Sequence, residues 1–181
     1  MKGTLKITKH DLPGKPEIIC YTIIDSSIGS ILIASSGKGV CCITLGDHPE
    51  LLLGDLHHRF MNAELVRDDE TLKGLIPQVV GFVKSPQLGL DLPLDVRGTP
   101  FQQRVWQALR KIPCGSTASY ADIARMIGSP SSIRAVAGAC AANPISLAIP
   151  CHRILRSDGH ISGYRWGIER KRILLAMEAS T

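Results

Sequence analysis

The chain has 181 residues, of which 44% are hydrophobic and 20% are charged, close to the average of globular proteins. These values argue against a disordered, collagen-like or coiled-coil chain, and the length allows one sizeable domain or two small ones. The apolar runs 31–34 and 40–45 are too short to span a membrane, and residues 1–10 lack the apolar stretch of a signal peptide. We therefore expect a cytoplasmic protein with no membrane partner.

The net charge of +5 is unevenly distributed along the chain. Residues 1–96 carry nine Lys and Arg against twelve Asp and Glu, whereas residues 97–181 carry twelve against four. Positive charge concentrated in one half indicates a polyanion such as a nucleic acid as the partner of that half. A basic surface exposed only to solvent explains the same counts, so charge alone leaves both interpretations open.

The first half predicts a sheet followed by helices. Runs rich in β-branched residues at 18–24 and 30–34 predict a hairpin, and the run 40–45 adds a third strand to an antiparallel meander. Apolar residues recur at helical spacing over 49–60 and 70–84, which predicts two helices. No catalytic motif stands out in this half, so we expect it to act as a scaffold.

The second half opens with marked helix signals after a connector at 88–98. Thr99 followed by Pro100, with Gln102 three residues after Thr99, predicts a capping box and a helix to about residue 109. Ser119 and Asp122 repeat the capping-box spacing and predict a short helix that ends near Gly128.

A further helix is predicted over 131–142, ending before Asn143 because Pro144 follows. With the preceding short helix it forms a helix-turn-helix candidate. The helix carries one stripe at i, i+3, i+4, i+7 spacing, which consists of Arg134, Ala137, Gly138 and Ala141. Such small residues admit a neighbouring helix or a nucleic-acid groove, and the basic charge of this half favours the groove.

Only one of the six cysteines has polar chemistry beside it, in the segment Pro150-Cys151-His152-Arg153. The thiolate is the reactive form of cysteine, and a neighbouring imidazole or cation favours it. The alternative is a buried cysteine beside an ordinary loop histidine. The chain has neither a secretory signal nor a C-x-x-C pair, so we expect most thiols to be free, with packing roles for Cys20, Cys41, Cys42 and Cys140.

This segment, together with Gly-Tyr-Arg-Trp-Gly at 163–167 and Arg-Ala-Val-Ala at 134–137, resembles the active-site signature of the O6-alkylguanine-DNA alkyltransferases. The likeness extends back through 97–106 and 112–115 and covers roughly residues 90–178. It is greatest to the alkyltransferase half of the two-part bacterial adaptive-response proteins. The first half resembles the family only in its order of strands and helices.

The resemblance implies an α/β fold in two domains. Residues 1–92 would form an RNase-H-like scaffold, an antiparallel meander with helices. Residues 93–181 would form a mostly helical, winged-helix-like helix-turn-helix domain that holds both the DNA-binding surface and the active site.

The resemblance also implies chemical roles. Cys151 would accept the alkyl group, His152 would act as its general base through a water molecule, and Glu178 would hold the imidazole in its working tautomer. Tyr120 would donate a hydrogen bond to the departing guanine. Asn143 would bridge the helix-turn-helix to the active-site loop.

The target atom lies inside a duplex, so the base must be flipped out of the stack. The resemblance implies that Arg134 fills the gap and that its helix lies in the minor groove. The other implied substrate and DNA contacts are Ala135, Gly138, Pro150, Arg153, Tyr164 and Arg165. We expect the ring of Trp166 to narrow the pocket and so to favour methyl over bulky adducts.

The implied activity is a single, irreversible transfer of an alkyl group from O6-alkylguanine in double-stranded DNA to Cys151, with O4-alkylthymine as a further substrate to test. We expect a monomer that uses neither a metal nor a cofactor. Two other classes remain, a non-catalytic damage-binding protein and a cysteine hydrolase. The acceptor cysteine argues against the first, and the basic half with Arg134 argues against the second.

Overall fold

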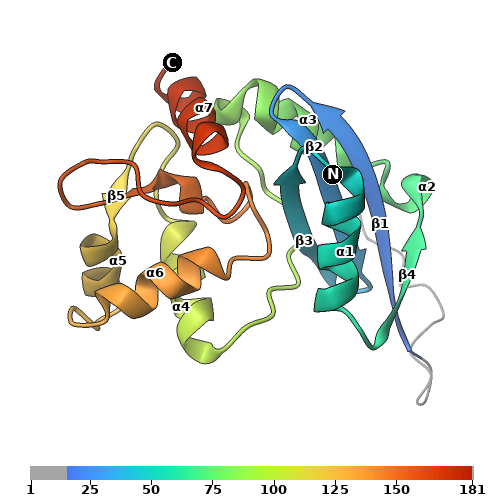
Figure 1. Cartoon of the computed structure of the whole chain (residues 1–181), viewed down its shortest axis with the longest axis horizontal. Helices are drawn as coiled ribbons and strands as arrows, with labels where there is room; N and C mark the ends of the chain where they lie inside the picture. The colour runs from blue at the N-terminus through green and yellow to red at the C-terminus, as the bar shows by residue number, and fades with distance from the viewer. Residues whose placement is uncertain (1–15, 181) are drawn as a thin grey trace.

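The computed structural model describes residues 16–180 and shows an α/β fold (Figure 1). A four-stranded sheet has the order β3-β2-β1-β4. Its strands are β1 (Glu17–Ser26), β2 (Gly29–Ser36), β3 (Gly39–Gly46) and β4 (Ala63–Arg67). The first three form the predicted antiparallel meander, but β4 was not predicted and runs parallel to β1, so the sheet is mixed.

Successive side chains of a strand point to opposite faces of the sheet, and here both faces carry apolar side chains. Leu32 and Ala34 point toward helix α1 (Pro49–Arg59), whereas Ile31 and Ile33 point toward the opposite face. Figure 1 shows α1 lying over one face of the sheet, with the helices of the second half to one side of the sheet. Because both faces are covered, the sheet serves as a rigid support for the rest of the chain.

The single helix predicted over 70–84 is interrupted. The structure has a one-turn helix α2 (Asp69–Leu72) and a separate helix α3 (Ile76–Lys84), followed by the 3-10 turn η1 (Pro86–Leu88). Gly74 lies in the break, where glycine is a poor helix former, and Pro77 lies in the first turn of α3, where proline is tolerated.

The predicted helices of the second half are all present. They are α4 (Pro100–Leu109), α5 (Tyr120–Met126) and α6 (Ile133–Ala141), and the chain ends with α7 (Ile168–Ala179). Both predicted capping boxes form, at Thr99 and at Ser119. Helix α6 begins at residue 133, two residues later than predicted. None of the helices within residues 16–180 has the length and apolar character needed to cross a membrane.

One hydrophobic core joins the two halves of the chain. Ile31 and Ile43 of the sheet belong to the same buried cluster as Val105 and Leu109 of α4 and Leu174 of α7. A polar contact reinforces this junction, since the guanidinium of Arg170 donates to the Ile28 carbonyl at 2.7 Å. The sheet therefore fixes the position of the helical half directly.

Candidate active site around Cys151

The edge of strand β3 holds the loop that leads to Cys151. The Ile43 amide donates to the Pro144 carbonyl at 3.0 Å, and the Ser146 amide donates back to the Ile43 carbonyl at 2.9 Å. Leu147 then adopts a φ of 69°, a left-handed conformation that is strained for a residue with a side chain. Leu147 is buried, so surrounding contacts hold this strained turn in place.

The side chain of Asn143, which is fully buried, fastens the same loop to the acceptor sulfur. Its carbonyl oxygen accepts from the Ile145 amide at 2.9 Å, and its amide group donates to the Ile149 carbonyl at 2.8 Å. The same amide group donates to Sγ of Cys151 at 3.2 Å. Asn143 thus links the end of α6 to the sulfur, which is the position that the resemblance implies for it.

Cys151 begins the 3-10 turn η2 (Cys151–Arg153) and is 5% exposed. Burial raises the pKa of its thiol to about 11, although the Asn143 hydrogen bond and the positive charge of Lys171 both act to lower it. At neutral pH the resting group is therefore a thiol, and a base must remove its proton before the sulfur can attack.

The residue after Cys151 belongs to a buried imidazole–carboxylate pair. His152 Nε2 lies 2.7 Å from Glu178 Oε1, and neither side chain is more than 1% exposed. Burial lowers the pKa of His152 despite the opposing effect of Glu178. Burial alone would raise the pKa of Glu178, but hydrogen bonds from His152 and Arg153 lower it to about 2. The pair is therefore a neutral imidazole and a carboxylate.

This charge state fixes the tautomer of His152. A carboxylate only accepts, so Nε2 carries the hydrogen and Nδ1 carries the free lone pair. Nδ1 is buried and has no hydrogen-bond partner within residues 16–180. The histidine is consequently arranged as a proton acceptor.

Arg153 was expected at the substrate or the DNA, and the structure places it inside the protein instead. It is 7% exposed, and its Nε donates to Glu178 Oε2 at 2.9 Å while its Nη1 donates to the Ile112 carbonyl at 2.6 Å. Its charged partner is the buried Glu178 carboxylate, because a buried anion without a neutralising cation is strongly destabilising. Arg153 therefore holds Glu178 and does not line the cavity, contrary to the expected contact with substrate or DNA.

Cys151 faces a cavity of about 330 Å³. The cavity is lined by Tyr120, Ala137, Cys140, Ala141, Cys151, Gly163, Tyr164 and Arg165. The structure thus brings Tyr120, Tyr164 and Arg165 together with the sulfur, as the resemblance implied, and adds the inner part of the α6 stripe. Cys140 was predicted to pack and lines the cavity as well.

Trp166 does not line this cavity, contrary to the expectation that its ring narrows the pocket. Trp166 is 6% exposed and packs edge-on against Tyr164, with 5.1 Å between ring centroids. The chain turns inward after the exposed Arg165, so the Trp166 ring packs against the cavity-lining Tyr164 from inside the protein. The width of the pocket therefore depends on Tyr164 rather than on Trp166.

The remaining predicted contacts lie on the outer surface of α6 or just before the sulfur. Arg134, Ala135 and Gly138 are exposed, and Pro150 is buried. Arg134 forms no ion pair with any residue between 16 and 180. A Cβ built at Gly138 would meet no atom within 4 Å, so packing inside the chain does not require glycine there.

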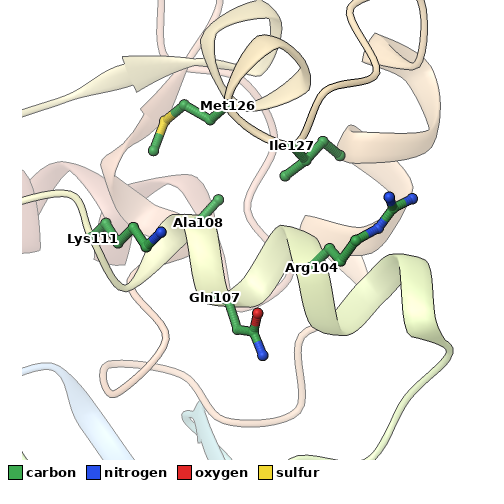
Figure 2. Close-up of a pocket in the computed structure, with 6 residues that line it drawn as sticks. All are labelled: Arg104, Gln107, Ala108, Lys111, Met126 and Ile127. Carbon is green, nitrogen blue, oxygen red and sulfur yellow. The ribbon is translucent and has the colours of Figure 1, made fainter.

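A second hollow of about 260 Å³ lies between α4 and the end of α5 (Figure 2). Figure 2 shows Arg104 and Lys111 on either side of Ala108, facing Met126 and Ile127. This hollow holds no nucleophile or acid, so it adds positive surface and not chemistry. Among residues 16–180, no group of three or more His, Cys, Asp or Glu side chains could hold a metal ion.

Lys171 is a site residue that the sequence did not indicate. It is 1% exposed, and its Nζ donates to the carbonyls of Ile154 and Ser162. Its positive charge acts on Cys151. Lysines in terminal helices are usually exposed, so only the packing of α7 could reveal this one.

Comparison with known proteins identifies the family. The family model described as 6-O-methylguanine DNA methyltransferase, DNA binding domain, matches residues 100–180. The inducible methylated-DNA–protein-cysteine methyltransferase of Bacillus subtilis is 38% identical over 147 residues, which cover 81% of this chain and 82% of that protein. The chain belongs to the methylated-DNA–protein-cysteine methyltransferase family.

Other members of this methyltransferase family extend the comparison. The bifunctional transcriptional activator/DNA repair enzyme Ada of Escherichia coli is 46% identical over 176 residues, covering 97% of this chain. The chain spans about half the length of Ada, namely 49%. The crystal structure of Mycobacterium tuberculosis OGT in complex with DNA matches with a TM-score of 0.76 and 36% identity, covering 90% of this chain and 93% of that one. These matches confirm the expected family and its α/β fold.

Proposed function

We propose that this protein repairs DNA by direct reversal. It transfers the alkyl group, typically methyl, from the O6 atom of alkylguanine in double-stranded DNA to Sγ of Cys151. The observation that carries the proposal is a buried thiol that faces a cavity, backed by a neutral histidine whose Nδ1 is unpaired within residues 16–180. Methylated-DNA–protein-cysteine methyltransferases at 34–38% identity over most of the chain support it.

The first step is removal of the thiol proton. His152 Nδ1 accepts it through a bridging water molecule, while Glu178 accepts the Nε2 hydrogen and holds the ring. Arg153 keeps Glu178 ionised. As positive charge develops on the imidazole, the carboxylate stabilises it at 2.7 Å.

The second step is an in-line displacement. The Sγ–carbon bond of Cys151 forms as the carbon–O6 bond breaks, and the electron pair of that bond moves onto guanine. Tyr120 donates a hydrogen bond to the departing base, which lowers the cost of its negative charge. The product is a thioether, which the protein's own base cannot cleave, so each molecule acts once and needs no cofactor. O4-alkylthymine presents a similar alkoxy carbon and is proposed as a second substrate.

The damaged base reaches the cavity by flipping out of the duplex. We propose that α6 lies in the minor groove, that Arg134 fills the vacated stack, and that Ala135 and Gly138 allow close approach of the DNA backbone. Support comes from the exposure of these residues and from the open space around Gly138. The protein binds DNA as a monomer, and a reaction on chromosomal DNA fits the cytoplasmic location predicted from the sequence.

The same proposal assigns a two-part organisation. Of the predicted domain 1–92, the described residues 16–92 form an RNase-H-like scaffold, which the sheet order β3-β2-β1-β4 with parallel β1 and β4 supports. Of the predicted domain 93–181, the described residues 93–180 form the winged-helix-like helix-turn-helix part that binds DNA and carries out the transfer. Residues 1–15 and 181 lie outside the described residues. The basic charge of this second part and the pairing of β5 (Ala118–Ser119) with β6 (Ile154–Leu155) support the assignment.

The test is to incubate the protein with an O6-methylguanine duplex and to map modified peptides by mass spectrometry. We expect one methyl group on Cys151, none in the Cys151→Ala variant, and an unchanged result in Cys20→Ala, which removes a half-buried thiol remote from the cavity. An unmodified Cys151 or full repair by Cys151→Ala would overturn the proposal. Tight binding without transfer would favour a damage-binding protein, and repeated ester cleavage would favour a hydrolase.

A further inference from the structure

The hydroxyl group of Tyr120 is already engaged at the edge of the cavity. Its oxygen lies 2.6 Å from Oγ of Ser162, a half-buried residue next to the cavity-lining Gly163. We propose that Ser162 is a positioning residue that orients the Tyr120 hydroxyl and strengthens it as a donor to the departing guanine. This inference rests on the proposed function.

The donor and acceptor capacities of the two hydroxyl groups support this role. A tyrosine hydroxyl has one hydrogen and can also accept, and a serine hydroxyl can do either. When Tyr120 directs its hydrogen at the base, Ser162 can turn its own hydrogen toward the tyrosine oxygen. The 2.6 Å contact then survives substrate binding with only its direction reversed.

A hydrogen bond donated by Ser162 to the tyrosine oxygen also stabilises the negative charge that develops during the reaction. As the carbon–O6 bond breaks, negative charge grows on guanine and draws the Tyr120 hydrogen toward it. A hydrogen bond donated into the tyrosine oxygen stabilises the charge left there, since hydrogen bonds in a chain polarise one another. In the resting structure, burial raises the pKa of Tyr120 and the Ser162 contact opposes that rise.

Ser162 is itself fixed relative to the nucleophile. Its carbonyl accepts from Nζ of the buried Lys171 at 3.5 Å, and the same Nζ binds the carbonyl of Ile154, directly after the turn η2 that carries Cys151. Lys171 therefore fixes the segments that carry the tyrosine's partner and the acceptor sulfur relative to each other. A serine on an unanchored loop would not give the hydroxyl a defined position.

The test is a double-mutant cycle on the rate of methyl transfer, measured in single turnover at saturating O6-methylguanine duplex. We expect Ser162→Ala to slow transfer about three- to tenfold, the worth of one neutral hydrogen bond, with little change in DNA affinity. In the Tyr120→Phe background the same substitution should cost nothing further, since the hydroxyl that it serves is gone. Ser162→Thr, which keeps an oxygen at the same position, should restore the rate to within about twofold.

Ser85→Ala is the matched control, because it removes a half-buried serine hydroxyl that does not line the cavity, and it should leave the rate unchanged. Equal losses from Ser162→Ala in both backgrounds, or no loss in either, would overturn the role of Ser162 while leaving the transfer reaction in place. A parent protein that places no methyl group on Cys151 would instead overturn the proposed function, and with it this inference.

Discussion

The buried Glu178 carboxylate both orients His152 and neutralises Arg153, so removing its charge should lower stability as well as activity. Glu178→Gln keeps the shape of the side chain and removes that charge. The pKa of Glu178 is about 2 against an ordinary value of 4.5, and each unit corresponds to about 1.4 kcal/mol. The free energy of unfolding at pH 7 should therefore fall by about 3 kcal/mol, in line with the cost of breaking a buried ion pair.

The same shift predicts a pH dependence. A carboxyl group whose pKa is lowered by folding stabilises the protein fully above its unfolded pKa, near 4.5, and this stabilisation is lost as the pH falls toward 2. The glutamine variant has no such group. The stability gap between parent and Glu178→Gln should therefore be constant near neutral pH and should shrink between pH 4.5 and pH 2.

Urea unfolding followed by circular dichroism across this pH range measures the gap. Glu169→Gln on the same helix is the matched control, because the Glu169 side chain is 78% exposed and its ion pair with Arg172, at 2.8 Å, lies on the surface. Its effect should stay below about 0.5 kcal/mol. A loss in Glu178→Gln no larger than in this control, or a gap that persists undiminished at pH 2, would refute the reasoning.

Three further predictions concern the site and its surroundings. Asn143→Ala removes a hydrogen-bond donor to Cys151, so the midpoint of the pH profile for alkylation of that thiol by a small neutral electrophile should rise. Methyl transfer should slow by about tenfold or more. An unchanged pH profile would contradict this. Arg134→Ala should slow transfer even at saturating DNA, whereas Arg104→Ala should only weaken binding and reduce the salt slope by about one; identical behaviour of the two variants would be the contrary result. Trp166→Phe keeps a ring behind the cavity wall, so the ratio of benzyl to methyl transfer should change by less than about threefold, and a larger change would place that ring in the pocket.

Local signals in the sequence predicted the elements that local chemistry determines. The capping boxes at Thr99 and Ser119 form as predicted, because a side chain and a backbone amide three residues apart are sufficient to make them. The meander follows from β-branched runs separated by glycine turns. At Gly29, φ is 99° and an added Cβ would lie 2.7 Å from the Gly46 carbonyl oxygen, so only glycine fits.

Features that depend on distant contacts were missed. Strand β4 is short, and its pairing with β1 comes from register in the assembled sheet. The inward turn of Arg153 depends on Glu178, which lies 25 residues later in the sequence. The contact between Tyr120 and Ser162 joins residues 42 positions apart. Residue type and spacing pointed to Cys151 and His152, and the family resemblance added Glu178 and Tyr120. Tertiary packing determined how these groups are held.

On the proposed mechanism, Cys151 accepts one alkyl group and is then spent. The most direct measurement titrates a fixed amount of O6-methylguanine duplex with increasing amounts of protein and counts the bases repaired. We predict a linear rise with a slope of one repaired base per protein molecule, which ends when the duplex is exhausted at equimolar protein, with the methyl group recovered on the peptide that contains Cys151. Continued repair beyond that ratio, or methyl groups recovered on another residue, would contradict it.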